Sequence, residues 1–170
     1  MIIPESKLPN LITNKYVTTG YSRFDKIIDK YWWSHAINLL PKNLAPNIIS
    51  VLSVTCMIFS YIILTPFDTT FSIPPPSFVV LICVFFHFFC ETFDALDGKQ
   101  ARRTGMATPL GMLMDTGCDS LTATFIGLST IQCMGLGMSE KAIWLITIEQ
   151  SWLFLEIWEE YHTGVSRTQI

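Results

Sequence analysis

Between Lys42 and Asp68 the sequence contains no charged residue. Within this window, residues 47–65 read NIISVLSVTCMIFSYIILT and are mostly apolar. A helix of this length rises about 30 Å, which is the thickness of the hydrocarbon core of a bilayer. The window therefore predicts a first membrane-spanning helix, and this requirement constrains the fold of the whole chain.

The composition supports a membrane protein and excludes several other classes. Half of the 170 residues are hydrophobic and only 15% are charged, whereas about 25% are charged in an average soluble domain. This balance argues against a disordered chain and against an ordinary soluble enzyme. The formal net charge of −3 argues against binding to nucleic acid, because a nucleic-acid-binding protein presents a basic face.

Three further apolar segments follow the first, and prolines mark the loop between residues 66 and 76. We predict spans over about 77–93, 116–137 and 142–158. The last is the weakest, because Glu149 and Glu156 interrupt it. The predicted fold class is an all-α integral membrane protein with an interfacial N-terminal amphipathic helix and about four transmembrane helices.

The basic residues predict the orientation of these spans. Six of the eleven precede the first span, none lies in the first loop, and three lie in the second. Since cytosolic loops are rich in Lys and Arg, we expect the N-terminus and the second loop in the cytosol. Phe24, Ile27, Ile28 and Tyr31 recur with a helical period and predict a helix in the cytosolic interface. The predicted parts are a cytosolic segment (1–45), a membrane domain (46–164) and a polar tail (165–170).

Four carboxylates occur in two pairs around the second loop. Asp94 and Asp97 are three residues apart, Asp115 and Asp119 are four apart, and each pair falls on one helix face. A helical hairpin would bring the pairs together, where they would repel one another close to lipid unless a cation neutralised them. Oxygen ligands alone favour a hard cation, so the pattern predicts Mg²⁺ or Mn²⁺.

The residues around these acids suggest a phosphorylated ligand. Gly98, Ala101 and Gly111 are small enough to let a bulky ligand approach, and Arg102 can bind a phosphate through its guanidinium. A metal and an arginine at a cytosolic mouth favour phosphoryl transfer from a nucleotide.

The same stretch matches D-x2-D-G-x2-A-R-x8-G-x3-D-x3-D and resembles the signature of the CDP-alcohol phosphotransferase family. Flanking segments are similar to the eukaryotic choline/ethanolamine phosphotransferase branch: LAPNIIS (44–50), DGKQARRTGMATPLG (97–111), GCDS (117–120) and WEEYHTG (158–164). The resemblance covers residues 16–164. The signature positions are Asp94, Asp97, Gly98, Ala101, Arg102, Gly111, Asp115 and Asp119.

The resemblance implies transfer of phosphocholine or phosphoethanolamine from CDP-choline or CDP-ethanolamine to diacylglycerol, with release of CMP. It implies that two divalent cations are bound by Asp94, Asp97 and Asp115, and that Asp119 completes the metal site or acts as the catalytic base. The CDP site would include Asn47, Gly98 and Arg102, with Ala101 and Gly111 also lining the substrate site. The resemblance further implies a homodimer in the endoplasmic reticulum or Golgi, with its active site facing the cytosol.

Two departures from the branch leave other functions open. Relatives usually read G-E-L-F-D-H-G-C-D where this chain has Met112 and Thr116 in place of the Glu and the His. Family members also have a six-helix core, so about four spans predict a shortened form. The alternatives are a weak or inactive member that binds CDP-alcohol or pairs with a full-length relative, and a transferase with a different alcohol acceptor. No residue distinguishes choline from ethanolamine.

Overall fold

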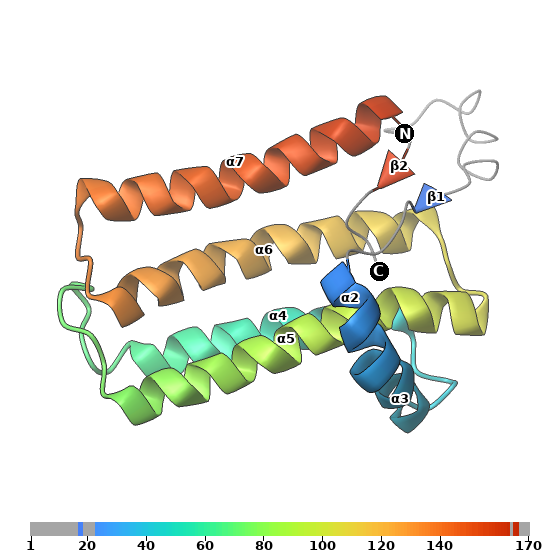
Figure 1. The fold of residues 1–170 in the computed structure, drawn as a ribbon, viewed down its shortest axis with the longest axis horizontal. Helices are drawn as coiled ribbons and strands as arrows, with labels where there is room; N and C mark the ends of the chain where they lie inside the picture. The colour runs from blue at the N-terminus through green and yellow to red at the C-terminus, as the bar shows by residue number, and fades with distance from the viewer. Residues whose placement is uncertain (1–16, 19–22, 164, 167–170) are drawn as a thin grey trace, which may run out of the picture.

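The computed structural model describes residues 17–18, 23–163 and 165–166. Four long helices run antiparallel to their neighbours in sequence, and short helical turns precede them (Figure 1). The remaining parts of the predicted N-terminal segment (1–16 and 19–22) and of the predicted tail (167–170) lie outside the described residues. The long helices are α4 (Pro46–Leu64), α5 (Ser77–Thr104), α6 (Pro109–Met134) and α7 (Glu140–Thr163).

Helix α4 packs against both α5 and α6, and α7 lies along α6 (Figure 1). Two helices, α4 and α5, are long and apolar enough to cross a membrane. The first predicted span coincides with α4 to within one residue, and the helical character of the others is confirmed. The count of four spans stays a prediction. The prediction of helices alone needs one addition, a parallel pair of two-residue strands, β1 (Val17–Thr18) and β2 (Val165–Ser166).

Helix α5 extends beyond the second predicted span. Helix α5 continues to Thr104, because no residue before Gly105 breaks it; Gly105 adopts the left-handed conformation (φ 69°) that ends helices. Helix α6 then begins earlier than predicted, where Thr108 caps the backbone N–H of Gly111 and Pro109 occupies the first turn. All four signature aspartates therefore lie inside helices and not at their ends.

A polar network fixes the loop between α4 and α5 at the far end of the bundle. The carboxylate of Asp68 accepts hydrogen bonds from the backbone N–H and hydroxyl of Thr70 and from the backbone N–H of Ile73 and Ser72, and these bonds lower the pKa of Asp68 to about 2. Gln132 of α6 donates to the backbone oxygens of Leu64 (2.7 Å) and Asp68 (2.9 Å). Gln132 thus connects α6 to the end of α4 and to the loop that follows it.

The N-terminal segment crosses the other end of α5 (Figure 1). Trp33 is buried against α4 and α5, and Ile28 packs on the same cluster, whereas Phe24, Ile27 and Tyr31 remain exposed. One apolar side is therefore packed and another is open, which is compatible with the predicted interfacial helix. The segment comprises α2 (Arg23–Ile28), a π-helical turn η2 (Asp29–Trp33), α3 (Ser34–Ala36) and a 3-10 turn η3 (Ile37–Leu39).

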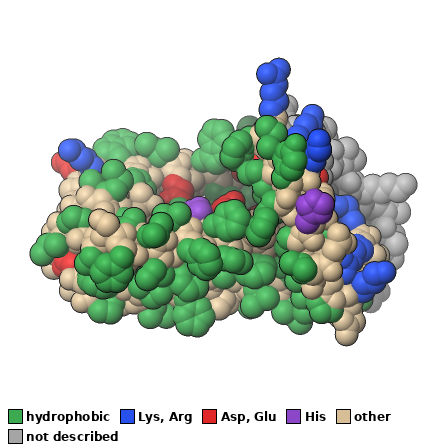
Figure 2. All heavy atoms as spheres, turned by 60° about the horizontal axis from the view of Figure 1, so that its bottom comes forward, with side chains coloured by type: hydrophobic (Ala, Val, Ile, Leu, Met, Phe, Trp, Pro, Cys, Tyr) green, Lys and Arg blue, Asp and Glu red, His purple; other side chains and the backbone are tan. Residues whose placement is uncertain are grey.

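The surface has two chemically different regions. Figure 2 shows most Lys and Arg side chains of this face toward the end where α2 and α3 lie in Figure 1, while hydrophobic side chains cover most of the rest. A few acidic side chains interrupt the apolar region. This separation of charge agrees with the predicted placement of the α5–α6 connection on the cytosolic side, which stays a prediction.

Candidate active site

The structure brings the signature aspartates of α5 and α6 together. One carboxylate oxygen from each of Asp94, Asp97 and Asp115 lies within 4.8 Å of the others. Asp119 joins the group, because its carboxyl group contacts that of Asp94. Asp97 is buried, Asp115 and Asp119 are half-buried, and Asp94 is exposed, so the cluster is open to solvent on one side.

The donor set of this cluster suits a hard divalent cation. All the ligands are carboxylate oxygens, and three of them converge closely enough for one ion to contact each. Lys99, which is close to these acids in sequence, pairs with Asp29 on another side of α5. The residues present therefore fit a metal site.

Helix α4 supplies a third wall, which the sequence pattern predicted only in part. Asn47, in its first turn, lies close to α6: a Cβ atom added to Gly111 would be 3.5 Å from the Asn47 side-chain oxygen. One turn later, the hydroxyl of Ser50 donates a hydrogen bond to the carboxylate of Asp97. Sequence reasoning missed Ser50, because a serine in an apolar helix gives no signal of its partner 47 residues away.

The other predicted ligand-binding residues lie near the acids along α5. Gly98 and Ala101 are half-buried and Arg102 is exposed. Since Ala101 is seven residues from Asp94, it lies on nearly the same helix face, two turns nearer the α5–α6 connection. The structure thus places these three residues between the acid cluster and the basic end of the bundle.

The two departures from the branch pattern also lie beside the acids. Met112 and Thr116 are both half-buried on α6. The hydroxyl of Thr116 donates to the backbone oxygen of Met112 at 3.1 Å, so its proton is engaged in a hydrogen bond within α6. Neither side chain can accept a proton as a carboxylate or imidazole would. Asp115 directly precedes Thr116, and Asp119 lies about one turn after it.

Comparison with known families adds an independent observation. A family profile described as CDP-alcohol phosphatidyltransferase matches residues 43–155, which include all four helices in whole or in part and every signature aspartate. The chain belongs to the CDP-alcohol phosphatidyltransferase family. The membership predicted from the eight signature positions is therefore confirmed.

Several curated proteins match nearly the whole chain. An uncharacterized class-I family protein of Schizosaccharomyces pombe is 34% identical over 168 residues, covering 96% of this chain and 43% of the relative. Cholinephosphotransferase 1 of Saccharomyces cerevisiae is 31% identical over 161 residues, covering 95% of this chain and 41% of the relative. The mouse cholinephosphotransferase 1 is 29% identical over 163 residues, with 95% and 41% coverage. The chain thus spans about two fifths of the length of these relatives.

Proposed function

We propose that this CDP-alcohol phosphatidyltransferase transfers phosphocholine or phosphoethanolamine from the corresponding CDP ester to diacylglycerol and releases CMP. The observation that carries the proposal is the convergence of the Asp94, Asp97 and Asp115 carboxylates within 4.8 Å, in a chain whose signature and relatives belong to this class of transferase. The similarity to cholinephosphotransferases over 95% of the chain favours this head-group class over other CDP-alcohol chemistry.

In this reaction the diacylglycerol hydroxyl oxygen forms a bond to the phosphorus that bears the head group. The bond from that phosphorus to the bridging oxygen of the pyrophosphate breaks, and CMP leaves with the bonding electrons. The proton of the hydroxyl must pass to a base, and we assign this role to Asp119, which is half-buried and contacts Asp94.

The acid cluster would hold Mg²⁺ or Mn²⁺, with two ions expected by the family resemblance. Asp94, Asp97 and Asp115 would be the ligands, and Asp119 could complete the site. When bound, such ions neutralise the pyrophosphate and stabilise the charge that develops on the leaving CMP. We assign the CDP site to Asn47, Gly98, Ala101, Arg102 and Gly111, which lie around the acids on three helices.

We also infer where the reaction takes place. The basic end of the bundle (Figure 2) supports a cytosolic active site in the endoplasmic reticulum or Golgi membrane, where diacylglycerol is available. Membrane lipid would surround the exposed apolar side chains of α5 and α7. The homodimer that we expect follows from the family resemblance alone.

The test is CMP release by the purified chain in nanodiscs that contain diacylglycerol and Mg²⁺, with CDP-choline and CDP-ethanolamine offered separately. We expect release with at least one donor, and its loss in Asp97→Ala and Asp115→Ala. Glu140→Gln, which changes an exposed acid at the start of α7, serves as the control and should keep wild-type activity.

Three results would contradict the proposal. Retained release in both aspartate variants would remove the metal assignment. Metal-dependent binding of CDP-choline with no release of CMP would indicate a binding protein, while release only with another acceptor alcohol would leave the transferase class but change the substrate.

A further inference from the structure

Two opposite faces of α5 serve different purposes. Asp94, Gly98 and Ala101 share the face that carries the acid cluster. Arg103 is nine residues, or two and a half helical turns, from Asp94 and therefore points the opposite way. Lys99 and Gln100, which are variable positions of the signature, flank Arg103 on that second face.

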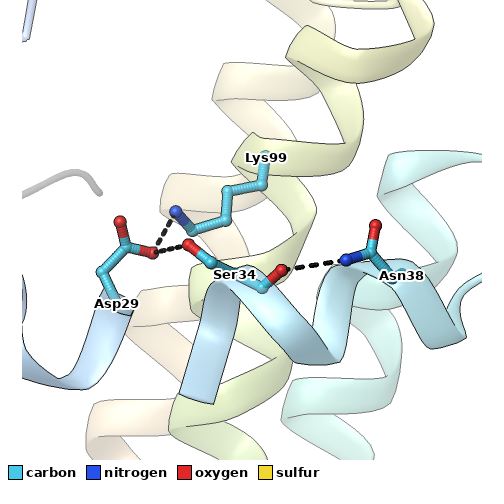
Figure 3. Close-up of polar contacts among 4 residues, drawn as sticks. All are labelled: Asp29, Ser34, Asn38 and Lys99. Carbon is cyan, nitrogen blue, oxygen red and sulfur yellow. Dashed lines mark hydrogen bonds and ion pairs between the residues drawn. The ribbon is translucent and has the colours of Figure 1, made fainter. Parts of the chain in front are cut away.

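This second face of α5 binds the N-terminal segment at several points. Figure 3 shows Lys99 of α5 reaching Asp29, whose carboxylate also accepts a hydrogen bond from Ser34. The ion pair between Lys99 and Asp29 is 2.5 Å long and partly buried. About two turns before Lys99 along the helix axis, Thr92 accepts a hydrogen bond from the indole N–H of Trp32 at 3.1 Å.

A second set of contacts holds the elbow that connects this segment to α4. Gln100 is fully buried (0% exposed) and its amide nitrogen donates to the backbone oxygens of Pro41 and Leu44, both at 2.9 Å. The guanidinium of Arg103 donates to the backbone oxygens of Ile37 (2.5 Å) and Leu40 (2.8 Å). Two side chains of α5 thus bind four carbonyls within residues 37–44, which we call the elbow.

The elbow matters because α4 begins immediately after it. Ala45, the N-cap of α4, provides no side-chain cap, and Pro46 lacks a backbone N–H. The start of α4 therefore depends on contacts made by the elbow for its position against α5. Asn47 and Ser50, which approach Gly111 and Asp97, lie only three and six residues after Leu44.

We propose that Gln100 and Arg103 are positioning residues: by holding the elbow against one face of α5, they fix the first turn of α4 against the acid cluster on the other face. The inference rests on the proposed function for its kinetic consequence. It also makes the interfacial segment part of the active-site scaffold, since the same side of α5 binds both the elbow and Asp29.

The chain contains a matched control for Gln100. Gln132 is also fully buried (1% exposed) and its amide nitrogen also donates to two backbone oxygens next to a helix end. However, it lies thirteen residues beyond Asp119 on α6, which corresponds to about 20 Å along the helix. Gln100→Leu and Gln132→Leu therefore remove equivalent hydrogen bonds, near the acid cluster and far from it.

The experiment compares these two variants in the full chain in nanodiscs by direct Mn²⁺ binding, by the KM for CDP-choline and by thermal unfolding. Mutating a residue that orients a metal ligand typically weakens metal affinity 10- to 100-fold. For Gln100→Leu we expect Mn²⁺ binding weaker by about tenfold and a raised KM, since Ser50 and Asn47 shift together. Gln132→Leu should lower the thermal stability similarly but leave Mn²⁺ affinity and KM unchanged. Arg103→Lys keeps the charge but loses the paired donors, and should weaken Mn²⁺ binding in the same direction.

The outcomes separate this inference from the proposed function. If the wild type releases no CMP but Gln100→Leu still weakens Mn²⁺ binding relative to Gln132→Leu, the transfer reaction is wrong and the positioning role stands. If Gln100→Leu fails to fold, Arg103→Lys against the wild type decides by the same Mn²⁺ measurement. Equal Mn²⁺ affinity and equal KM in the Gln100 and Gln132 variants, or an unchanged Arg103→Lys protein, would overturn the inference.

Discussion

The hydrogen bond from Ser50 to Asp97 gives the sharpest prediction about the acid cluster. Ser50 and Asp97 are both buried, with 4% and 6% of their surfaces exposed. The hydroxyl therefore donates to a carboxylate that has little access to water. The bond fixes one oxygen of Asp97, whose carboxyl group also contacts that of Asp115. Removing it in Ser50→Ala should leave the carboxylate free to rotate and raise the cost of holding its charge.

The magnitude follows from the nature of the bond. A hydrogen bond to a charged group contributes about 1.5–3 kcal/mol, and about 1.4 kcal/mol corresponds to a tenfold change in an equilibrium constant. Not all of this energy reaches the metal, because a bound cation itself orients the carboxylate. We therefore expect Ser50→Ala to weaken Mg²⁺ or Mn²⁺ binding by about 10- to 100-fold, the usual range for partners of metal ligands.

The assay is titration of Mn²⁺ against the protein in nanodiscs, together with the Mg²⁺ concentration that gives half-maximal CMP release. Ser53→Ala is the control, since Ser53 lies three residues further along α4, is equally buried (2% exposed) and contacts the thiol of Cys90 instead of an acid. Ser50→Thr retains the hydroxyl and should restore most of the affinity. Equal metal affinity in Ser50→Ala and Ser53→Ala would refute the reasoning.

Two predictions concern stability at the far end of the bundle. Gly135→Ala should destabilise the protein by more than the ~1–2 kcal/mol that a left-handed residue costs, because the added Cβ would lie 2.8 Å from the ring of Pro74. Gly105→Ala is the control, since Gly105 has the same backbone conformation and an added Cβ would meet no atom within 4 Å. Thermal unfolding of the two variants therefore separates the steric clash from the conformational cost. Asp68 has a pKa lowered to about 2, so its stabilising contribution is fully present above its unfolded value near 4 and is lost as the pH falls toward 2. Asp68→Asn should therefore remove part of the dependence of the melting temperature on pH below 4, and an unchanged pH profile would contradict the assignment.

Much of the helical framework follows from local sequence. The charge-free window before Asp68 predicts α4 to within a residue, because the length needed to cross a bilayer is a property of the segment itself. The period of the helix places Asp94 with Asp97, and Asp115 with Asp119, on shared faces. Glycine and proline residues account for the ends of α5 and α6, and α5 extends beyond the apolar segment that predicts the second span.

The sequence by itself therefore determined the apolar helices, the pairing of acids within each helix and, through the signature, the family. Only the tertiary structure decided which side chains support those acids. Ser50 and Asp97 are 47 residues apart, and Gln100 is 59 residues from Pro41. Such contacts depend on how α4, α5 and the elbow pack against one another, and a residue's own neighbours in sequence carry no information about a partner that only helix packing brings within hydrogen-bonding distance.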